Sequence, residues 1–185
     1  MINNSIEKIY LFLFSLVPIS IIIGSSVSLL NILFILVVFL IFTARSIEKE
    51  IFKNSVLIFL IILYMYLIFN SFIAVDFEMS ASRNFGFIRF ILLFIVVNYF
   101  FNSSNKANNI FSFWSLIIII VAFDCFIEFS FGRNILGYGI KGPLGSKWER
   151  IVSFFKDEPV VGAYINAFIF IIIGYFFDKF IEKDL

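Results

Sequence analysis

Six long apolar runs, separated by short islands of charged residues, constrain this chain more than any other feature of its sequence. A membrane-spanning helix needs about 20 mainly apolar residues, with a usable range of about 17–25. Charged islands between such runs are typical of the loops that lie outside a bilayer. The runs are Ile9–Ile23, Leu29–Phe42, Val56–Ile73, Phe85–Phe101, Ile110–Phe131 and Val160–Phe177.

The composition indicates that these runs are not the core of a soluble domain. Of the 185 residues, 62% are hydrophobic and 15% are charged, whereas a soluble domain carries about 25% charged residues. We therefore expect an all-α fold, a polytopic bundle of about six transmembrane helices without a sheet, with residues 1–185 in a single transmembrane domain. The first two runs are short and Pro18 interrupts the first, which predicts a tight hairpin around Gly24.

The orientation of the chain follows from its basic residues. Six spans place both termini on one side, and cytoplasmic loops carry an excess of Lys and Arg. Leaving out the fifth connecting loop, residues 132–159, seven basic residues lie on the N-terminal side and one on the other, which predicts a cytoplasmic N-terminus. The seven are Lys8, Arg45, Lys49, Lys53, Lys106, Lys179 and Lys183; the one is Arg83. The fifth loop departs from this bias, because its basic residues Arg133, Lys141, Lys147, Arg150 and Lys156 are then outside.

Several kinds of chemistry are excluded by residue counts. The chain has no histidine, which removes His-ligated metal sites and His-based catalytic triads. Cys125 is the only cysteine, so no intramolecular disulfide forms, and the net charge of +1 gives no indication of a nucleic-acid partner. The stretch GYGIKG fits a dinucleotide-binding pattern, but it follows a predicted membrane helix rather than a strand, and Pro143 comes next, so we interpret it as a turn-rich loop.

Three ionisable residues lie inside apolar runs: Arg89, Asp124 and Glu128. Charges at bilayer depth are costly and usually face a partner or a wet cavity. Asp124 and Glu128 are four residues apart and share one helix face. We expect Arg89 to lie near the start of its helix and to pair with one of the two acidic residues. The cluster would either hold two helices together or form a substrate or proton site.

The end of the fifth loop is the second candidate site. Arg150 and Lys156 flank Phe154 and Phe155 in the stretch ERIVSFFKDEP. Arginine binds phosphate oxygens through a planar fork, and aromatic rings favour the membrane interface. A basic pocket at a membrane surface suits a lipid-linked phosphate or pyrophosphate. The alternative is a solvated charged loop with two Phe anchors.

The stretches DCFIEFSFGRNILGYG and ERIVSFFKDEPVVGAYI together resemble the bacterial O-antigen ligase and polymerase superfamily. The stretch RNFGFIRFILLF, with Arg83 and Arg89, is similar to an arginine-bearing span of that family. Three positions depart from the family pattern: Ser153 stands where a glycine is usual, Lys156 where a small residue is common, and Glu128 where a neutral amide is expected.

The resemblance implies a multi-pass protein of the bacterial inner membrane that transfers a glycan from an undecaprenyl-pyrophosphate carrier. The acceptor would be lipid A core in a ligase, or another repeat unit in a polymerase. It implies no metal ion or cofactor. Arg150 would contact the pyrophosphate, and Arg89, Lys156 and Arg83 would be further substrate-binding residues.

Family members also carry later spans and a later outer loop with a histidine. The resemblance therefore implies that this chain corresponds to the N-terminal part of such a protein and is inactive alone. A reading from a different class remains open: a small transporter or membrane-scaffold subunit in which Arg89, Asp124 and Glu128 form the central cluster.

Overall fold

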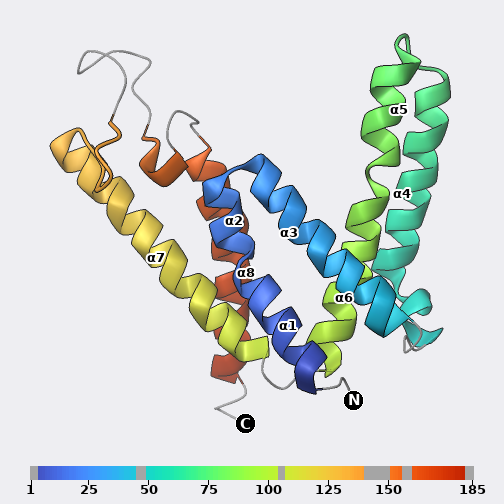
Figure 1. Cartoon of the computed structure of the whole chain (residues 1–185), viewed down its shortest axis with the longest axis horizontal. Coiled ribbons are helices and arrows are strands. Elements are labelled where there is room, and N and C mark those ends of the chain that lie inside the picture. The colour runs from blue at the N-terminus through green and yellow to red at the C-terminus, as the bar shows by residue number, and fades with distance from the viewer. Residues whose placement is uncertain (1–3, 45–48, 104–106, 140–150, 156–159, 182–185) are drawn as a thin grey trace. The chain divides into compact units, whose positions relative to one another are not determined.

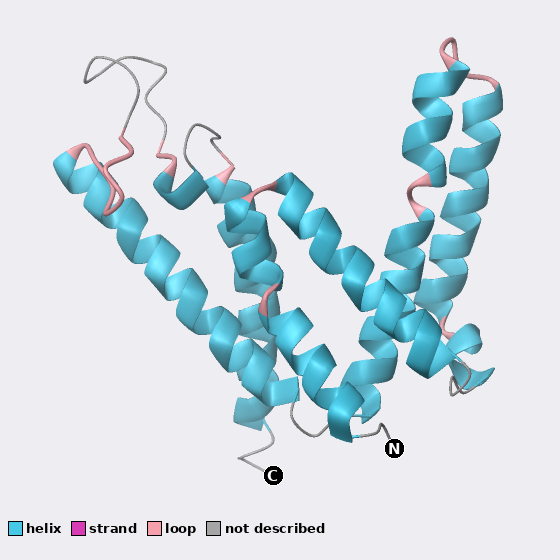
Figure 2. Cartoon of the chain, in the orientation of Figure 1, coloured by secondary structure: helices cyan, strands magenta, loops and turns pink. Residues whose placement is uncertain are grey.

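The computed structural model describes residues 4–44, 49–103, 107–139, 151–155 and 160–181, and almost all of them are helical (Figure 1). No strand occurs in these ranges, and the only β-type pairing among them is an isolated bridge between Arg133 and Gly139 (Figure 2). The expected all-α class is therefore confirmed.

Eight α-helices and three shorter helical segments make up the described chain. They are α1 (Asn4–Ser15), α2 (Val17–Ile23), α3 (Ser25–Val38), η1 (Phe39–Thr43), η3 (Lys49–Lys53), α4 (Ser55–Phe72), α5 (Phe77–Phe85), α6 (Ile88–Ser103), α7 (Ala107–Phe131), η4 (Ser153–Phe155) and α8 (Val161–Ile181). The predicted hairpin around Gly24 is present, because α2 ends at Ile23 and α3 begins at Ser25.

Four helical runs are long and apolar enough to cross a membrane: Ser25–Thr43, Ser55–Phe72, Phe77–Asn102 and Asn108–Phe131. The pair α1 and α2, bent by 40°, makes a fifth if it counts as one span, and α8 contributes a shorter apolar stretch, Val161–Phe177. Each expected apolar run thus corresponds to a helical segment; four or five of these segments meet this measure within the described residues, and the expected number of about six stays a prediction.

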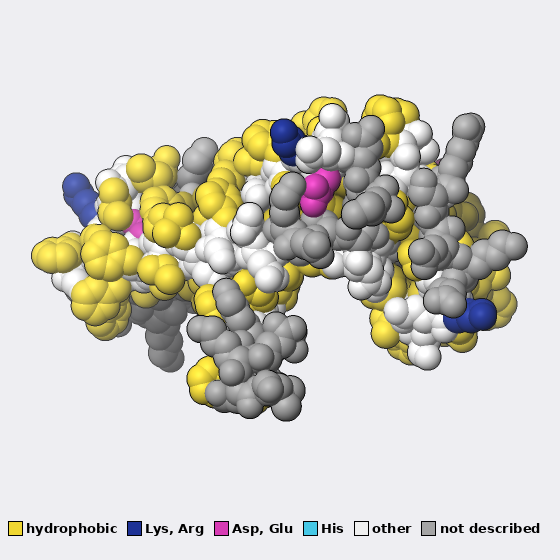
Figure 3. All heavy atoms as spheres, turned by 90° about the horizontal axis from the view of Figure 1, so that it is seen from below, with side chains coloured by type: hydrophobic (Ala, Val, Ile, Leu, Met, Phe, Trp, Pro, Cys, Tyr) yellow, Lys and Arg dark blue, Asp and Glu magenta, His cyan; other side chains and the backbone are white. Residues whose placement is uncertain are grey.

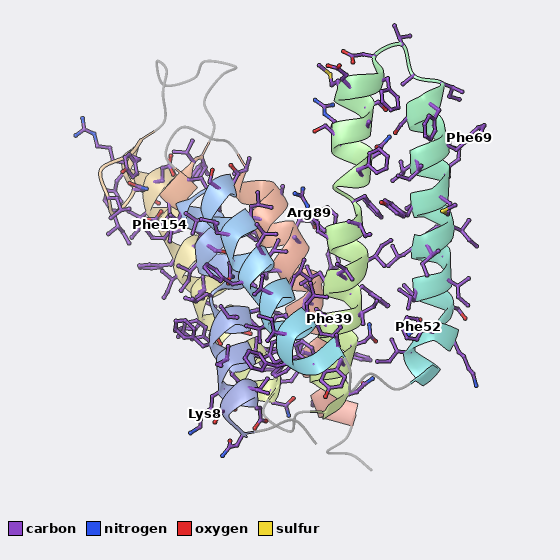
Figure 4. All side chains as sticks on the ribbon, turned by 45° about the vertical axis from the view of Figure 1, so that its right-hand side comes forward. Lys8, Phe39, Phe52, Phe69, Arg89 and Phe154 are labelled. Atoms are coloured by element: carbon purple, nitrogen blue, oxygen red, sulfur yellow. The ribbon has the colours of Figure 1, made fainter. Side chains whose placement is uncertain are left out.

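The surface of these helices is apolar, as contact with lipid requires. Only 11% of the α4 span is buried, and Figure 4 shows Phe69 on the side of α4 that points away from α5. Hydrophobic side chains make up much of the visible surface of the described residues (Figure 3). In water such exposure would be strongly unfavourable, whereas lipid tails solvate it.

The chain divides into two compact units, which are described separately: Met1–Phe14 with Leu29–Ala107, and Ser15–Ser28 with Asn108–Leu185. In the first unit, an aromatic cluster joins α1 to α6. The ring centroids of Phe14 and Phe100 are 5.1 Å apart, and those of Tyr10 and Phe100 are 5.6 Å apart. The Tyr10 hydroxyl is also 2.8 Å from Thr43 Oγ1 in η1, so one buried tyrosine links three elements.

The fourth apolar run begins earlier than the sequence predicts. Asp76 caps α5 by accepting a hydrogen bond from Met79 N at 3.0 Å, and α5 continues into α6 after a break at Gly86 and Phe87. The Nδ2 atom of Asn84 fastens α5 to α4 through Leu67 O at 3.0 Å. As expected, Arg89 lies at the start of its helix, because it is the second residue of α6; since α5 precedes α6, it also lies close to the middle of the 26-residue run Phe77–Asn102.

In the second unit, aromatic side chains pack α7 against α8. The centroids of Trp114 and Phe168 are 5.3 Å apart, and those of Phe111 and Tyr175 are 4.9 Å apart. Tyr164 of α8 donates its hydroxyl to Pro18 O of α2 at 3.4 Å. These contacts form the scaffold that supports the end of α7 and the segments that follow it.

Candidate functional site

The two acidic residues of α7 are completely buried. Asp124 and Glu128 each have 0% of their surface exposed, although α7 is otherwise one of the most apolar helices of the chain. A buried carboxylate needs hydrogen-bond donors to offset the loss of water. The donors come from two segments that follow α7, residues 132–139 and 151–155.

Glu128 binds the backbone of the segment just before α8. Its Oε2 atom accepts a hydrogen bond from Ser153 N at 2.6 Å, and both of its oxygens lie 3.2 Å from Val152 N. Two successive backbone N–H groups thus converge on one carboxylate, as they do in backbone anion-binding sites. The acceptor oxygens thus belong to Glu128 on α7, and the donors belong to the loop segment before α8.

Asp124 lies one turn earlier on α7 and ties both segments together. Its Oδ1 atom accepts a hydrogen bond from Ile135 N at 2.9 Å, and its Oδ2 atom accepts one from the Ser153 hydroxyl at 2.6 Å. The four-residue spacing predicts a common helix face, and both carboxylates indeed reach Ser153. We call Asp124, Glu128, Asn134 and Ser153 the carboxylate latch.

Asn134 completes the carboxylate latch from the first segment. Its Nδ2 atom donates to Ser153 O at 2.6 Å, which joins the two segments directly. Its Oδ1 atom accepts from Tyr138 N at 2.7 Å, and its own N–H donates to Tyr138 O at 2.6 Å. Residues 132–139 therefore form a closed turn rather than an open excursion.

Two glycines make this turn possible. Gly137 has φ +82°, a left-handed conformation that side chains rarely adopt. At Gly139, an added Cβ would lie 2.5 Å from the carbonyl oxygen of Gly132, so only a glycine lets the two ends of the turn approach this closely. Gly137 and Gly139, two of the three glycines of the GYGIKG stretch, therefore serve a tight turn.

Ser153 is the central residue of the carboxylate latch and carries backbone strain. It is fully buried, and its N–H, carbonyl and hydroxyl each take part in a hydrogen bond to Glu128, Asn134 and Asp124 respectively. Its φ of 48° is the only positive value at a non-glycine residue in the described chain. A left-handed backbone of this kind favours glycine over any residue with a side chain.

Two of the four predicted basic site residues, Arg83 and Arg89, lie in the first unit. Arg83 is exposed on α5, and Arg89 is half-buried on α6 with its guanidinium carbon 4.9 Å from the centroid of the Phe90 ring. The Arg89 Nε atom is buried and has no hydrogen-bond partner among the described residues. Arg89 belongs to the first unit and both acidic residues to the second, so their ion pair stays a prediction. Arg150 and Lys156 lie outside the described residues.

The expectation that both Phe154 and Phe155 are anchors at the membrane interface is wrong for Phe155. Phe155 is not available to the membrane interface: it is buried, and its ring centroid lies 5.1 Å from that of Tyr164 on α8. Phe154 is more exposed. Asn134 and Ser153 are not among the site residues predicted from the sequence. An Asn three residues before a Gly is a common turn signal, and it was the one available indication of Asn134.

Comparison with protein-family models, with curated proteins and with solved structures finds no match for this chain.

The hydrogen bonds of the carboxylate latch hold the two loop segments against the end of α7. All four carboxylate oxygens of Asp124 and Glu128 accept hydrogen bonds from the chain itself. Within the described ranges no group of acidic or cysteine side chains is arranged to hold a metal ion. Because all four carboxylate oxygens already accept hydrogen bonds, the two acidic residues are better suited to holding the loop segments in place than to binding a transported ion.

Proposed function

We propose that this chain takes part in transferring a glycan from an undecaprenyl-pyrophosphate carrier at a membrane surface, in the manner of an O-antigen ligase. The stretch that resembles that family begins at Asp124 and ends at Tyr164, and it includes every member of the carboxylate latch. Within this stretch, Asp124, Glu128 and Asn134 all contact Ser153, which is up to 29 positions away in the sequence, although Glu128 and Ser153 depart from the family pattern.

The observation that carries the proposal is the attachment of Val152 and Ser153 to Glu128. Arg150 precedes Val152 by two positions, so the backbone next to this arginine is held at the end of a membrane-spanning helix. At such a place the pyrophosphate of a lipid carrier would meet the protein, while its polyprenyl chain stayed in the bilayer.

The chemistry assigned to Arg150 follows from its side chain. The guanidinium is always protonated and presents a planar fork that matches two phosphate oxygens. It would bind the pyrophosphate in the ground state and stabilise the charge that develops as the glycan leaves. The acceptor would be lipid A core or another repeat unit.

Binding of undecaprenyl pyrophosphate to the purified chain in lipid nanodiscs tests the proposal. Loss of one charge-assisted contact costs about 1.5–3 kcal/mol, so Arg150→Ala should weaken binding about 10- to 100-fold. Arg150→Lys should recover part of the loss, because lysine keeps the charge but not the fork. Lys8→Ala, which removes an exposed charge from α1, is the matched control and should bind as the wild type does. Equal binding by wild type and Arg150→Ala would contradict the proposal.

A further inference from the structure

The turn formed by residues 132–139 runs back beside α7 instead of leaving the helix end. Ile135 N donates to Asp124 Oδ1, and Asp124 lies seven residues before the last residue of α7, Phe131. At 1.5 Å per residue, this places Asp124 about 10 Å below the helix end, and side chains on a helix tilt further toward its N-terminus. Figure 1 shows the chain after α7 folding back along its last turns.

This position lies within the apolar part of the span. The candidate span Asn108–Phe131 contains 24 residues, which corresponds to about 36 Å of helix, whereas the hydrocarbon core of a bilayer is about 30 Å thick. If the two are centred on each other, the core begins about two residues before Phe131. Asp124 and the backbone of Ile135 then lie about 7 Å inside it.

The backbone of the turn is suited to such a place. In hydrocarbon every backbone polar group needs a partner from the protein. The N–H groups of Gly132, Asn134, Gly137 and Tyr138 donate to acceptors on α7 or within the turn, and that of Ile135 donates to Asp124. A loop that projects into water needs none of these bonds.

The side chains of the turn are arranged with polar groups inside and apolar groups outside, the reverse of a water-exposed loop. Asn134 is buried, whereas Ile135 and Leu136 are 57% and 59% exposed. They extend the exposed apolar surface of α7, where Phe129 and Phe131 are 74% and 79% exposed.

From these observations we infer that the turn 132–139 is a lipid-inserted re-entrant element, held at membrane depth by Asp124. Ile135 and Leu136 contact acyl chains, and the partner of this surface is the lipid bilayer itself. The exposed Arg133 has a stem long enough to place its charge among the phosphate headgroups. This inference stands on the turn alone and is independent of the proposed glycan transfer.

Spin labelling in lipid vesicles tests the insertion. A nitroxide is attached to Leu136→Cys in a Cys125→Ala background, and its accessibility to oxygen is compared with its accessibility to a water-soluble nickel chelate. Met65→Cys, on the exposed face of α4, is the lipid reference, and Val75→Cys, in the connection between α4 and α5, is the water reference. The oxygen-to-nickel ratio at Leu136 should lie close to that at Met65. A ratio equal to that at Val75 would overturn the inference.

The same label tests the role of Asp124. In Asp124→Ala the turn loses its anchor, so the ratio at Leu136 should fall toward the Val75 value. The ratio at Met65 should stay unchanged, which shows that the helices remain embedded. An unchanged ratio at Leu136 would show that Asp124 does not hold the turn in the membrane.

Discussion

Ser153 allows the carboxylate latch to be tested by two substitutions that separate its hydrogen bond from its backbone strain. Ser153→Ala removes the hydroxyl that donates to Asp124 Oδ2 at 2.6 Å but keeps a side chain at a φ of 48°. Ser153→Gly removes the same hydroxyl and also relieves the left-handed backbone. Both variants keep the Ser153 N–H that donates to Glu128.

The expected free energies of unfolding follow from these two terms. Leaving a buried carboxylate one donor short costs about 1.5–3 kcal/mol, and this cost applies to both variants. A left-handed conformation costs a non-glycine residue about 1–2 kcal/mol, and Ser153→Gly relieves this cost. The same substitution makes the unfolded chain more flexible, which lowers the free energy of unfolding by about 0.4–1 kcal/mol. Ser153→Ala should therefore lose about 1.5–3 kcal/mol, and Ser153→Gly about 0.5–1 kcal/mol less than that.

Reversible unfolding by denaturing detergent in mixed micelles measures the difference. Ser130→Ala is the matched control, since Ser130 is exposed on α7 and its loss should change little. If Ser153→Ala is as stable as wild type, the hydroxyl does not support the buried carboxylate. If Ser153→Gly is less stable than Ser153→Ala, the backbone at this position is not strained.

Three further predictions concern other parts of the chain. Gly139→Ala should destabilise by about 1–3 kcal/mol because its Cβ meets backbone, whereas Gly174→Ala, with open space around it, should not; equal melting temperatures would contradict this. Ser146→Cys, in a background without the native cysteine, should react with an impermeant maleimide from outside intact spheroplasts, and labelling only after lysis would reverse the predicted orientation. Arg89→Gln alone should lower the amount of folded protein more than Arg89→Gln with Glu128→Gln, and equal loss in both would refute the ion pair.

The carboxylate latch changes how the fifth loop is understood. From sequence it is a glycine-rich, basic stretch between two spans, and its mobility is the simplest expectation. In the structure, its first and last described parts are bound to adjacent turns of α7 and to each other through Asn134 and Ser153. The described parts of this loop are therefore fixed to the end of α7.

The structure differs from the sequence-based expectations at the start of the fourth helical run and at Phe155, and each difference is caused by contacts of a few residues. The residues of α5 are polar on average, so hydropathy places the start of the fourth run at Phe85, but Asp76 caps them and Asn84 fastens them to α4, which extends the helix. The interpretation of Phe155 as an interfacial anchor rested on its residue type. Its burial against Tyr164 depends on where α8 lies relative to η4.

The sequence by itself determined the class of protein, the apolar helices and most of their limits, and the presence of two acidic side chains on one face of α7. These features follow from hydropathy and helical spacing, which are properties of neighbouring residues. The partners of those side chains were decided only by the tertiary structure. The donors to Asp124 and Glu128 lie 11 to 29 positions away, and a hydrogen bond forms only when the path of the chain brings a donor within about 3 Å of an acceptor.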